Sequence, residues 1–171
     1  ITDNVIPHEQ RPGDMPFTKY FLKSADAFLA MSKDVLKDLK TFTSKPSVFS
    51  PHPVYDNYGA PMGKQDACAQ LGLDANKKYI LFFGFIRKYK GLDILLDAMK
   101  DERIQQAGIQ LIVAGEFYDD EAAYLQQVEQ NGIKENVHLF TQFIPNNEIR
   151  YYFSAADLVV QPYRSATQSG I

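Results

Sequence analysis

Three cations stand close together in a loop that follows an apolar run. Residues 79–91 form an apolar segment, then Gly84, then Arg87, Lys88 and Lys90, with no acidic residue among them. Glycine lets a backbone approach a ligand closely, arginine can donate two hydrogen bonds to phosphate oxygens, and lysine adds a point charge. We therefore predict that Gly84, Arg87 and Lys90 bind a diphosphate and that Lys88 is solvated. The alternative is a loop whose cations all face solvent.

Two further loops carry polar groups that suit a nucleotide or a sugar. Glu116 follows Gly115 and is a candidate acceptor of hydrogen bonds from sugar hydroxyls, unless it only begins the next helix. A turn near the end of the chain offers hydroxyls and backbone amides that can receive an anion at a helix start, or it is a plain loop. Its candidate residues are Thr167, Gln168, Ser169 and Gly170. The sequence shows no catalytic triad, no paired carboxylates and no cluster of metal ligands.

The elements that carry these loops alternate between strands and helices. Apolar runs predict strands, buried on both faces, at residues 79–83, 109–114, 137–140 and 158–161. Amphipathic or capped segments after residue 91, from 119 to 132 and from 145 onward predict the helices between them. The order predicts an α/β fold with a Rossmann-like open parallel sheet and helices on both faces. In such a sheet ligands bind at the carboxyl ends of the strands, where the candidate loops lie.

The part of the chain before this pattern predicts a second, smaller unit. Residues 17–22 suit a helix, residues 27–31 suit a short buried strand, and Ser32 suits the N-cap of another helix. Prolines and glycines are frequent from 44 to 63, which predicts irregular linker structure. We assign residues 1–45 to the end of one domain, 46–75 to a linker region and 76–171 to a second domain.

Composition excludes several classes of protein. Hydrophobic residues make up 45% of the 171 residues and charged residues 23%, which is typical of a globular chain. A net charge of -3 argues against a nucleic-acid partner, because such domains are basic. The single cysteine, Cys68, rules out an intrachain disulfide. No apolar run approaches the ~20 residues that cross a bilayer.

Four segments, in order, resemble the carboxyl-terminal domain of retaining GT-B glycosyltransferases of the group 4 family, also called glycosyl transferases group 1. The segments are Phe-Phe-Gly-Phe-Ile-Arg-Lys-Tyr-Lys-Gly-Leu-Asp at 82–93, Leu-Ile-Val-Ala-Gly-Glu at 111–116, residues 137–140 followed by 143–145, and Ala-Asp-Leu-Val-Val-Gln-Pro-Tyr at 156–163. Residues 21–32 and 52–54 look like the end of the family's amino-terminal acceptor domain and its connection.

The resemblance implies a hexosyltransferase that uses a nucleoside-diphosphate sugar, retains the anomeric configuration and needs no metal or other cofactor. Arg87 and Lys90 would neutralise the departing diphosphate, and the backbone around Phe143 and Ile144 would face the nucleobase. Glu116 would lie near the nucleotide or sugar. The acceptor would be a glycan or a lipid-linked molecule bound by the other domain. Such enzymes build polysaccharides in the cytoplasm, and peripheral association with the inner face of the cytoplasmic membrane is compatible with this class.

The sequence departs from the family's Glu-x7-Glu motif. Thr167 occupies the position of the first acid, which normally meets the donor sugar, and the chain ends before the second. Since the last helix of the donor domain and most of the acceptor domain are absent, we expect an incomplete donor domain that does not catalyse transfer by itself. Two alternatives stay open: a catalytically inactive GT-B-like module that binds nucleotide sugars, and a nucleotide-sugar epimerase of GT-B fold.

Overall fold

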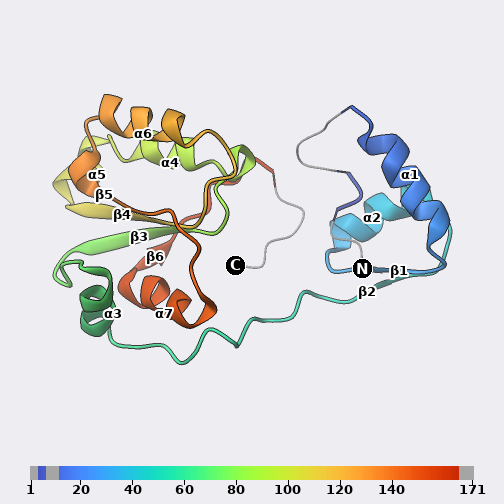
Figure 1. Ribbon diagram of the computed structural model, residues 1–171, viewed down its shortest axis with the longest axis horizontal. Coiled ribbons are helices and arrows are strands. Elements are labelled where there is room, and N and C mark those ends of the chain that lie inside the picture. The colour runs from blue at the N-terminus through green and yellow to red at the C-terminus, as the bar shows by residue number, and fades with distance from the viewer. Residues whose placement is uncertain (1–3, 7–11, 166–171) are drawn as a thin grey trace. The chain divides into compact units, whose positions relative to one another are not determined.

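A computed structural model provides the structure of the chain and describes residues 4–6 and 12–165. The chain divides into two compact units (Figure 1). One holds the described residues up to Tyr55 together with Ser165, and the other spans Asp56–Arg164. The boundary falls inside the segment 46–75 that the sequence assigns to a linker region.

The first unit is a small α/β arrangement. Its elements are α1 (Asp14–Ser24), β1 (Phe28–Ala30), α2 (Lys33–Phe42) and β2 (Ser47–Phe49). The side chain of Ser32 accepts a hydrogen bond from the backbone N of Asp34 at 3.2 Å, which confirms the predicted N-cap. The helix and strand predicted before Ser32 are confirmed as α1 and β1.

The irregular structure expected from residue 44 to 63 is wrong over β2. This strand runs parallel to β1, with Phe28 opposite Ser47. The backbone N of Phe28 donates to the carbonyl of Pro46 at 2.9 Å, and that of Ser50 donates to the carbonyl of Ala30 at 3.0 Å. Proline lacks an N–H donor, so Pro46 can stand beside a strand but contributes only its carbonyl to the pairing.

The second unit contains most of the regular structure. Its helices are α3 (Lys64–Leu71), α4 (Leu92–Ala98), α5 (Glu102–Gln106), α6 (Glu121–Gln130) and α7 (Asn146–Ala155), with 3-10 turns η1 (Lys88–Lys90) and η2 (Lys134–Asn136). Its strands are β3 (Lys78–Phe83), β4 (Ile109–Ala114), β5 (Val137–Phe140) and β6 (Leu158–Val159). All four predicted strands are present, although β6 is shorter than expected, and the helices α3 and α5 were not predicted.

The sheet of the second unit is parallel throughout, with strand order β5-β4-β3-β6. The chain pairs β5 with β4 and then crosses the sheet to place β6 beside β3, where Ile80 lies opposite Leu158. This crossover makes a topological switch point between β3 and β6, and the loops that leave their carboxyl ends diverge there. The predicted open, Rossmann-like α/β sheet is confirmed.

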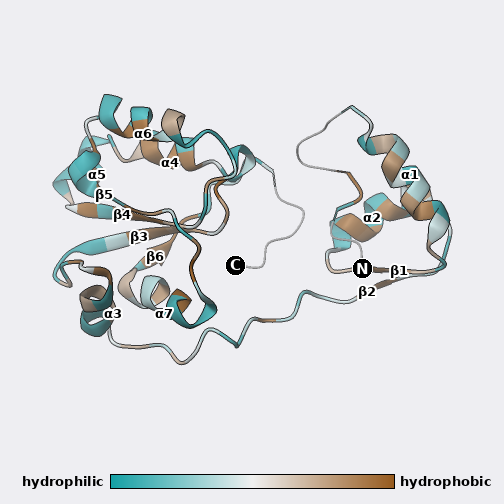
Figure 2. Ribbon diagram, in the orientation of Figure 1, coloured by the Kyte–Doolittle hydropathy of each residue, from teal (hydrophilic) through white to brown (hydrophobic). Residues whose placement is uncertain are grey.

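Helices cover both faces of this sheet (Figure 1). Phe82 of β3 belongs to a buried cluster with α4 and α6, whereas Leu81 belongs to a cluster with α3 and α7. Successive strand residues point to opposite faces, so a strand covered on both faces is apolar at nearly every position. Figure 2 shows both hydrophobic and hydrophilic colour on α6, as expected for a helix with one face on the sheet, whereas β4 is apolar except at Gln110.

Candidate functional site

The loop that follows β3 begins at a glycine. Gly84 has a φ of 102°, and its backbone N donates to the carbonyl of Ala114 at 2.9 Å. Gly115 faces it from the end of β4 with a φ of 138°, and a Cβ there would overlap the carbonyl of Gly84. The absence of a side chain at Gly115 therefore lets the two loops leave the sheet in contact with each other.

These two loops stay paired beyond the strand ends. The backbone N of Ile86 donates to the carbonyl of Glu116 at 2.8 Å, and the backbone N of Tyr118 donates to the carbonyl of Ile86 at 3.0 Å. The side chain of Ile86 is fully buried and anchors the loop in the apolar cluster beneath α4 and α6. Arg87 therefore follows a residue whose backbone and side chain are both held.

The guanidinium of Arg87 lies over an aromatic ring from the neighbouring loop. Its central carbon is 4.9 Å from the ring centroid of Tyr118, which is within the range of a cation–π contact. Phe85 packs edge-on against the same ring, with the two centroids 4.7 Å apart. Arg87 is half-buried, whereas Phe85 and Tyr118 are exposed.

Lys90 is the last residue of the 3-10 turn η1. Its positive charge interacts with that of Arg87. Its Nζ is 5.8 Å from the ring centroid of Tyr163, and its backbone N donates to the carbonyl of Arg87 at 2.9 Å. Burial lowers the pKa of Lys90, and the positive charge of Arg87 lowers it further. Burial and the repulsion from Arg87 therefore cost free energy while Lys90 is protonated, and a bound anion would offset this cost. Lys88 is exposed, as expected for a solvated side chain.

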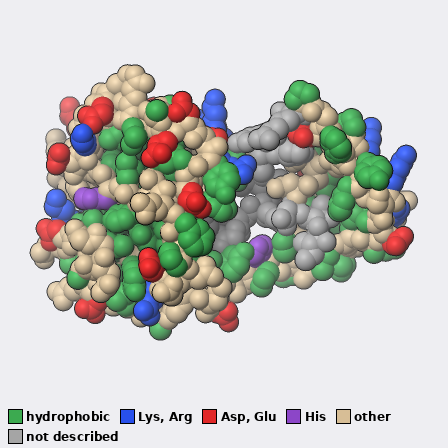
Figure 3. Space-filling view, in the orientation of Figure 1, with side chains coloured by type: hydrophobic (Ala, Val, Ile, Leu, Met, Phe, Trp, Pro, Cys, Tyr) green, Lys and Arg blue, Asp and Glu red, His purple; other side chains and the backbone are tan. Residues whose placement is uncertain are grey.

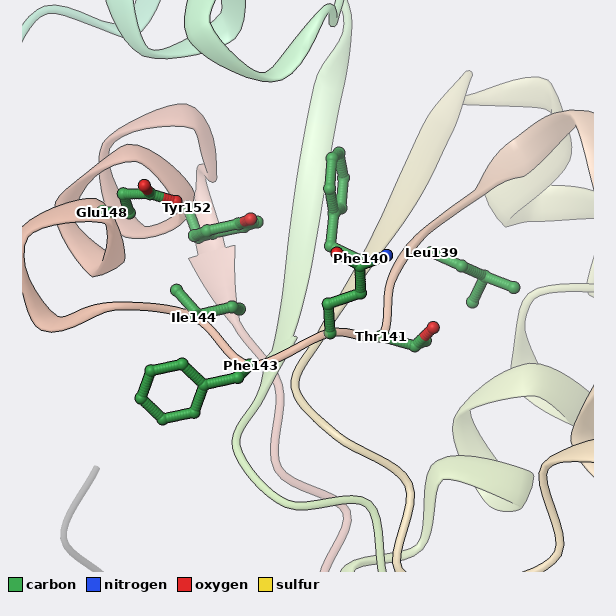
Figure 4. Close-up of a pocket in the computed structure, with 8 residues that line it drawn as sticks. Leu139, Phe140, Thr141, Phe143, Ile144, Glu148 and Tyr152 are labelled. Carbon is green, nitrogen blue, oxygen red and sulfur yellow. The ribbon is translucent and has the colours of Figure 1, made fainter.

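A pocket opens at the carboxyl end of β5. It has a volume of about 370 Å³, and Figure 4 shows Phe143 and Ile144 on the loop between β5 and α7, with Glu148 and Tyr152 reaching it from α7. The complete lining is Leu139, Phe140, Thr141, Gln142, Phe143, Ile144, Glu148 and Tyr152. Burial raises the pKa of Tyr152, and the charge of Glu148 raises it further.

The predicted residues that the structure describes all lie at the carboxyl edge of one parallel sheet. Gly84, Arg87 and Lys90 follow β3, Glu116 follows β4, and Phe143 with Ile144 follow β5. Glu116 is half-buried, and its backbone carbonyl accepts the hydrogen bond from the backbone N of Ile86. Thr167, Gln168, Ser169 and Gly170 lie outside the described residues.

Sequence reasoning missed several residues of this edge, and three of them bear on the arguments below. Glu148 lines the pocket, Tyr118 lies against Arg87, and Arg164 contacts the loop after β3 through a hydrogen bond from its side chain to the carbonyl of Lys88. The position of Glu148 in the first turn of the helix after β5 was a usable signal, because that turn faces the strand ends. Nothing local in the sequence indicates the contacts of Tyr118 or Arg164.

Two broader properties concern only the described part of the chain. Residues 4–6 and 12–165 contain no group of three or more His, Cys, Asp or Glu side chains that could hold a metal ion. Within the same residues, no helix has both the length and the apolar character needed to span a membrane. On the face of the second unit seen in Figure 3, acidic and basic side chains are interspersed among hydrophobic ones.

Solved structures share this fold. Sucrose-phosphate synthase from Thermosynechococcus elongatus superposes with a TM-score of 0.75 at 21% identity, over 94% of this chain and 41% of that protein. Anabaena HepE, solved in complex with UDP and glucose, gives a TM-score of 0.72 at 17% identity, over 98% of this chain and 46% of HepE. These similarities show that the chain shares the fold of the corresponding parts of the two proteins.

The family follows from the sequence comparison. The family described as glycosyl transferases group 1 matches residues 64–170. This match covers more than half of the 171 residues, and the chain belongs to that family.

Curated relatives agree with the family. D-inositol 3-phosphate glycosyltransferase of Segniliparus rotundus is 34% identical over 108 residues, which are 61% of this chain and 24% of the relative. The lipopolysaccharide core biosynthesis mannosyltransferase LpsB of Rhizobium meliloti is 25% identical over 150 residues, which are 86% of this chain and 42% of the relative. The chain therefore spans less than half the length of either relative.

Proposed function

We propose that this chain carries the donor diphosphate site of a retaining glycosyltransferase. The intact enzyme would move a hexose from a nucleoside-diphosphate sugar to a glycan or lipid-linked acceptor held by the other domain. The observation that carries the proposal is the position of Arg87 and Lys90, two cations that follow the same strand end, where burial first and then the charge of Arg87 lower the pKa of Lys90. The UDP and glucose found in HepE support a nucleotide-sugar donor.

The chemistry suits a leaving group that gains negative charge. As the bond between the anomeric carbon and the diphosphate oxygen breaks, charge collects on the diphosphate, and fixed cations placed there lower the barrier. Arg87 would bind two phosphate oxygens through its planar fork, and Lys90 would add a compact charge beside it. Since these side chains supply the positive charge, the proposed reaction needs no bound metal or other cofactor.

The pocket after β5 suits the nucleoside. Phe143 and Ile144 offer apolar surface for a base, and Glu148 offers a carboxylate that can accept hydrogen bonds from base N–H groups or ribose hydroxyls. We assign Glu116 to the nucleotide or sugar. On sequence alone, we assign the turn at 167–170 to the same ligand. We place the intact enzyme in the cytoplasm, in polysaccharide synthesis, with peripheral association at the inner membrane face as part of the same proposal.

Binding and turnover of the intact protein test this function. Titration calorimetry with UDP and with GDP should reveal binding of one of them, and incubation with the matching nucleotide sugar should release or transfer the sugar. Binding without hydrolysis or transfer would instead support an inactive nucleotide-sugar binding module, a role that Thr167 at the usual acidic position favours. Conversion of the sugar to its epimer would support the epimerase. If neither nucleotide binds, the diphosphate site is rejected.

A further inference from the structure

The segment after β6 folds back onto the loop after β3. The backbone N of Arg164 donates to the carbonyl of Tyr89 at 2.8 Å, and the rings of Tyr89 and Tyr163 lie edge to face with centroids 6.0 Å apart. A Cβ on Gly91 would overlap the carbonyl of Pro162, so the two backbones are in direct contact. Residues 162–164 therefore pack along the whole turn that contains Lys90.

The side chain of Arg164 extends this contact. Its two terminal nitrogens donate to the two carboxylate oxygens of Asp93, at 2.7 Å and 2.6 Å. One of them also donates to the carbonyl of Lys88 at 2.9 Å. These hydrogen bonds from Arg164 hold the pKa of Asp93 below its ordinary value. Such a two-pronged pair fixes an orientation as well as a distance.

These contacts bracket Lys90. Hydrogen bonds from Arg164 reach residues 88 and 89 before it and residue 93 after it, and the ring of Tyr163 lies beneath its ammonium. A lysine side chain has many rotamers, and the free energy of ordering one in the binding position opposes binding. A turn whose backbone is already fixed before the ligand binds lowers this free energy of ordering.

We propose that Arg164 is a positioning residue for Lys90. Through Asp93 and the carbonyl of Lys88 it holds the η1 turn so that the ammonium of Lys90 is aimed at the diphosphate. The inference rests on the proposed function, since it assumes that Lys90 binds a phosphate. It adds that the segment after β6 contributes to the site by shaping the loop after β3.

A double-mutant cycle on the intact protein tests this role. UDP and GDP affinities are measured for Arg164→Gln, Lys90→Ala and the double variant. We expect Arg164→Gln to weaken binding about fivefold to tenfold, in the range of coupled neighbours, and to have no further effect once Lys90 is removed. Arg164→Lys keeps one charged hydrogen bond and should recover part of the loss. Equal losses in the presence and absence of Lys90 would overturn the proposal.

The chain offers a matched control and a second variant. Arg103 makes a similar fork to Asp101, at 2.9 Å and 2.8 Å, before β4 and so at the opposite edge of the sheet, and Arg103→Gln should leave the affinity unchanged. If Arg164→Gln does not fold, Asp93→Asn weakens the same fork from the other side and should give the same coupling to Lys90. An unchanged affinity in Lys90→Ala rejects the proposed function itself. A loss in Lys90→Ala with none in Arg164→Gln or Asp93→Asn rejects only the positioning role.

Discussion

Arg87 lies over the ring of Tyr118, with its guanidinium carbon 4.9 Å from the ring centroid. The two residues belong to loops that follow neighbouring strands, and the backbone hydrogen bonds between Ile86 and residues 116 and 118 keep these loops together. One side of the guanidinium is thus occupied by an aromatic face. Stacking uses the face of a guanidinium and hydrogen bonding uses its rim, so the contact with Tyr118 does not compete with bonds to phosphate oxygens.

Removal of this ring should weaken binding of UDP or GDP. Tyr118→Ala loses the stacking contact, and an exposed cation–π pair contributes about 0.5–1 kcal/mol, so the affinity should fall about twofold to fivefold. Tyr118→Phe keeps the ring and is the matched control. Calorimetry on the intact protein measures both. Equal losses in the two variants would assign the effect to the hydroxyl group and contradict the stacking role.

Binding should depend on pH through Lys90. The ammonium attracts a diphosphate only while it is protonated, and its pKa lies below the ordinary lysine value of 10.5 because of burial and Arg87. The affinity should therefore fall as the pH rises through this lowered pKa, earlier than for an ordinary lysine. Measurements above pH ~7.5 avoid the second ionisation of the nucleotide's terminal phosphate, which has a pKa of about 6.

The control for this pH dependence is Lys90→Arg. Arginine stays protonated throughout the accessible range, so the fall in affinity at high pH should disappear. A fall of the same size in Lys90→Arg would place the titrating group elsewhere.

Phe143 should contribute to binding of the nucleoside but not of the phosphates. It is 71% exposed and lines the pocket after β5, so Phe143→Ala should leave the melting temperature unchanged. Base stacking on an aromatic ring is typically worth about 1–3 kcal/mol, which predicts at least about a fivefold loss of UDP affinity. Competition with inorganic pyrophosphate provides the control, because its affinity should not change. A loss for both ligands would contradict the separation of the two subsites.

A side chain at Gly115 should lower the free energy of unfolding. Its Cβ would overlap the carbonyl of Gly84, and its φ of 138° suits glycine alone, so Gly115→Ala should destabilise the protein by about 2–4 kcal/mol. Gly108 also has a positive φ, of 65°, but no atom lies within 4 Å of its Cβ position. Gly108→Ala should cost about 1 kcal/mol. Urea denaturation compares the two, and equal losses would show that the loops can separate at Gly115.

Most of the fold was predictable because its signals are local. Apolar runs mark strands covered on both faces, and caps such as Ser32 mark helix starts. The helix α5 escaped prediction because five residues are too few to show a helical period, and α3 escaped it because its eight residues bury only Ala67 and Cys68. The strand β2 was hidden by its proline neighbours, although Val48 and Phe49 suit a strand.

The candidate site was predictable in part, for a related reason. Residues that directly follow a strand, such as Arg87 and Glu116, can be placed at the sheet edge from sequence alone. The fork between Arg164 and Asp93 joins positions 71 residues apart, and the stacking of Tyr118 on Arg87 depends on the pairing of two loops. No local pattern encodes such contacts, because they form between residues that only the order of the strands in the sheet brings together.

Binding of the donor's diphosphate by Arg87 and Lys90 is tested most directly by calorimetric titration of the intact protein with UDP and GDP. Arg87→Ala and Lys90→Ala should each lower the affinity for the bound nucleotide at least about tenfold, as expected for loss of a charge-assisted contact. Lys88→Ala removes the same charge from an exposed position of the same turn and should leave the affinity unchanged. Unaltered circular dichroism would show that the variants fold. Wild-type affinity in Arg87→Ala and Lys90→Ala would contradict the account.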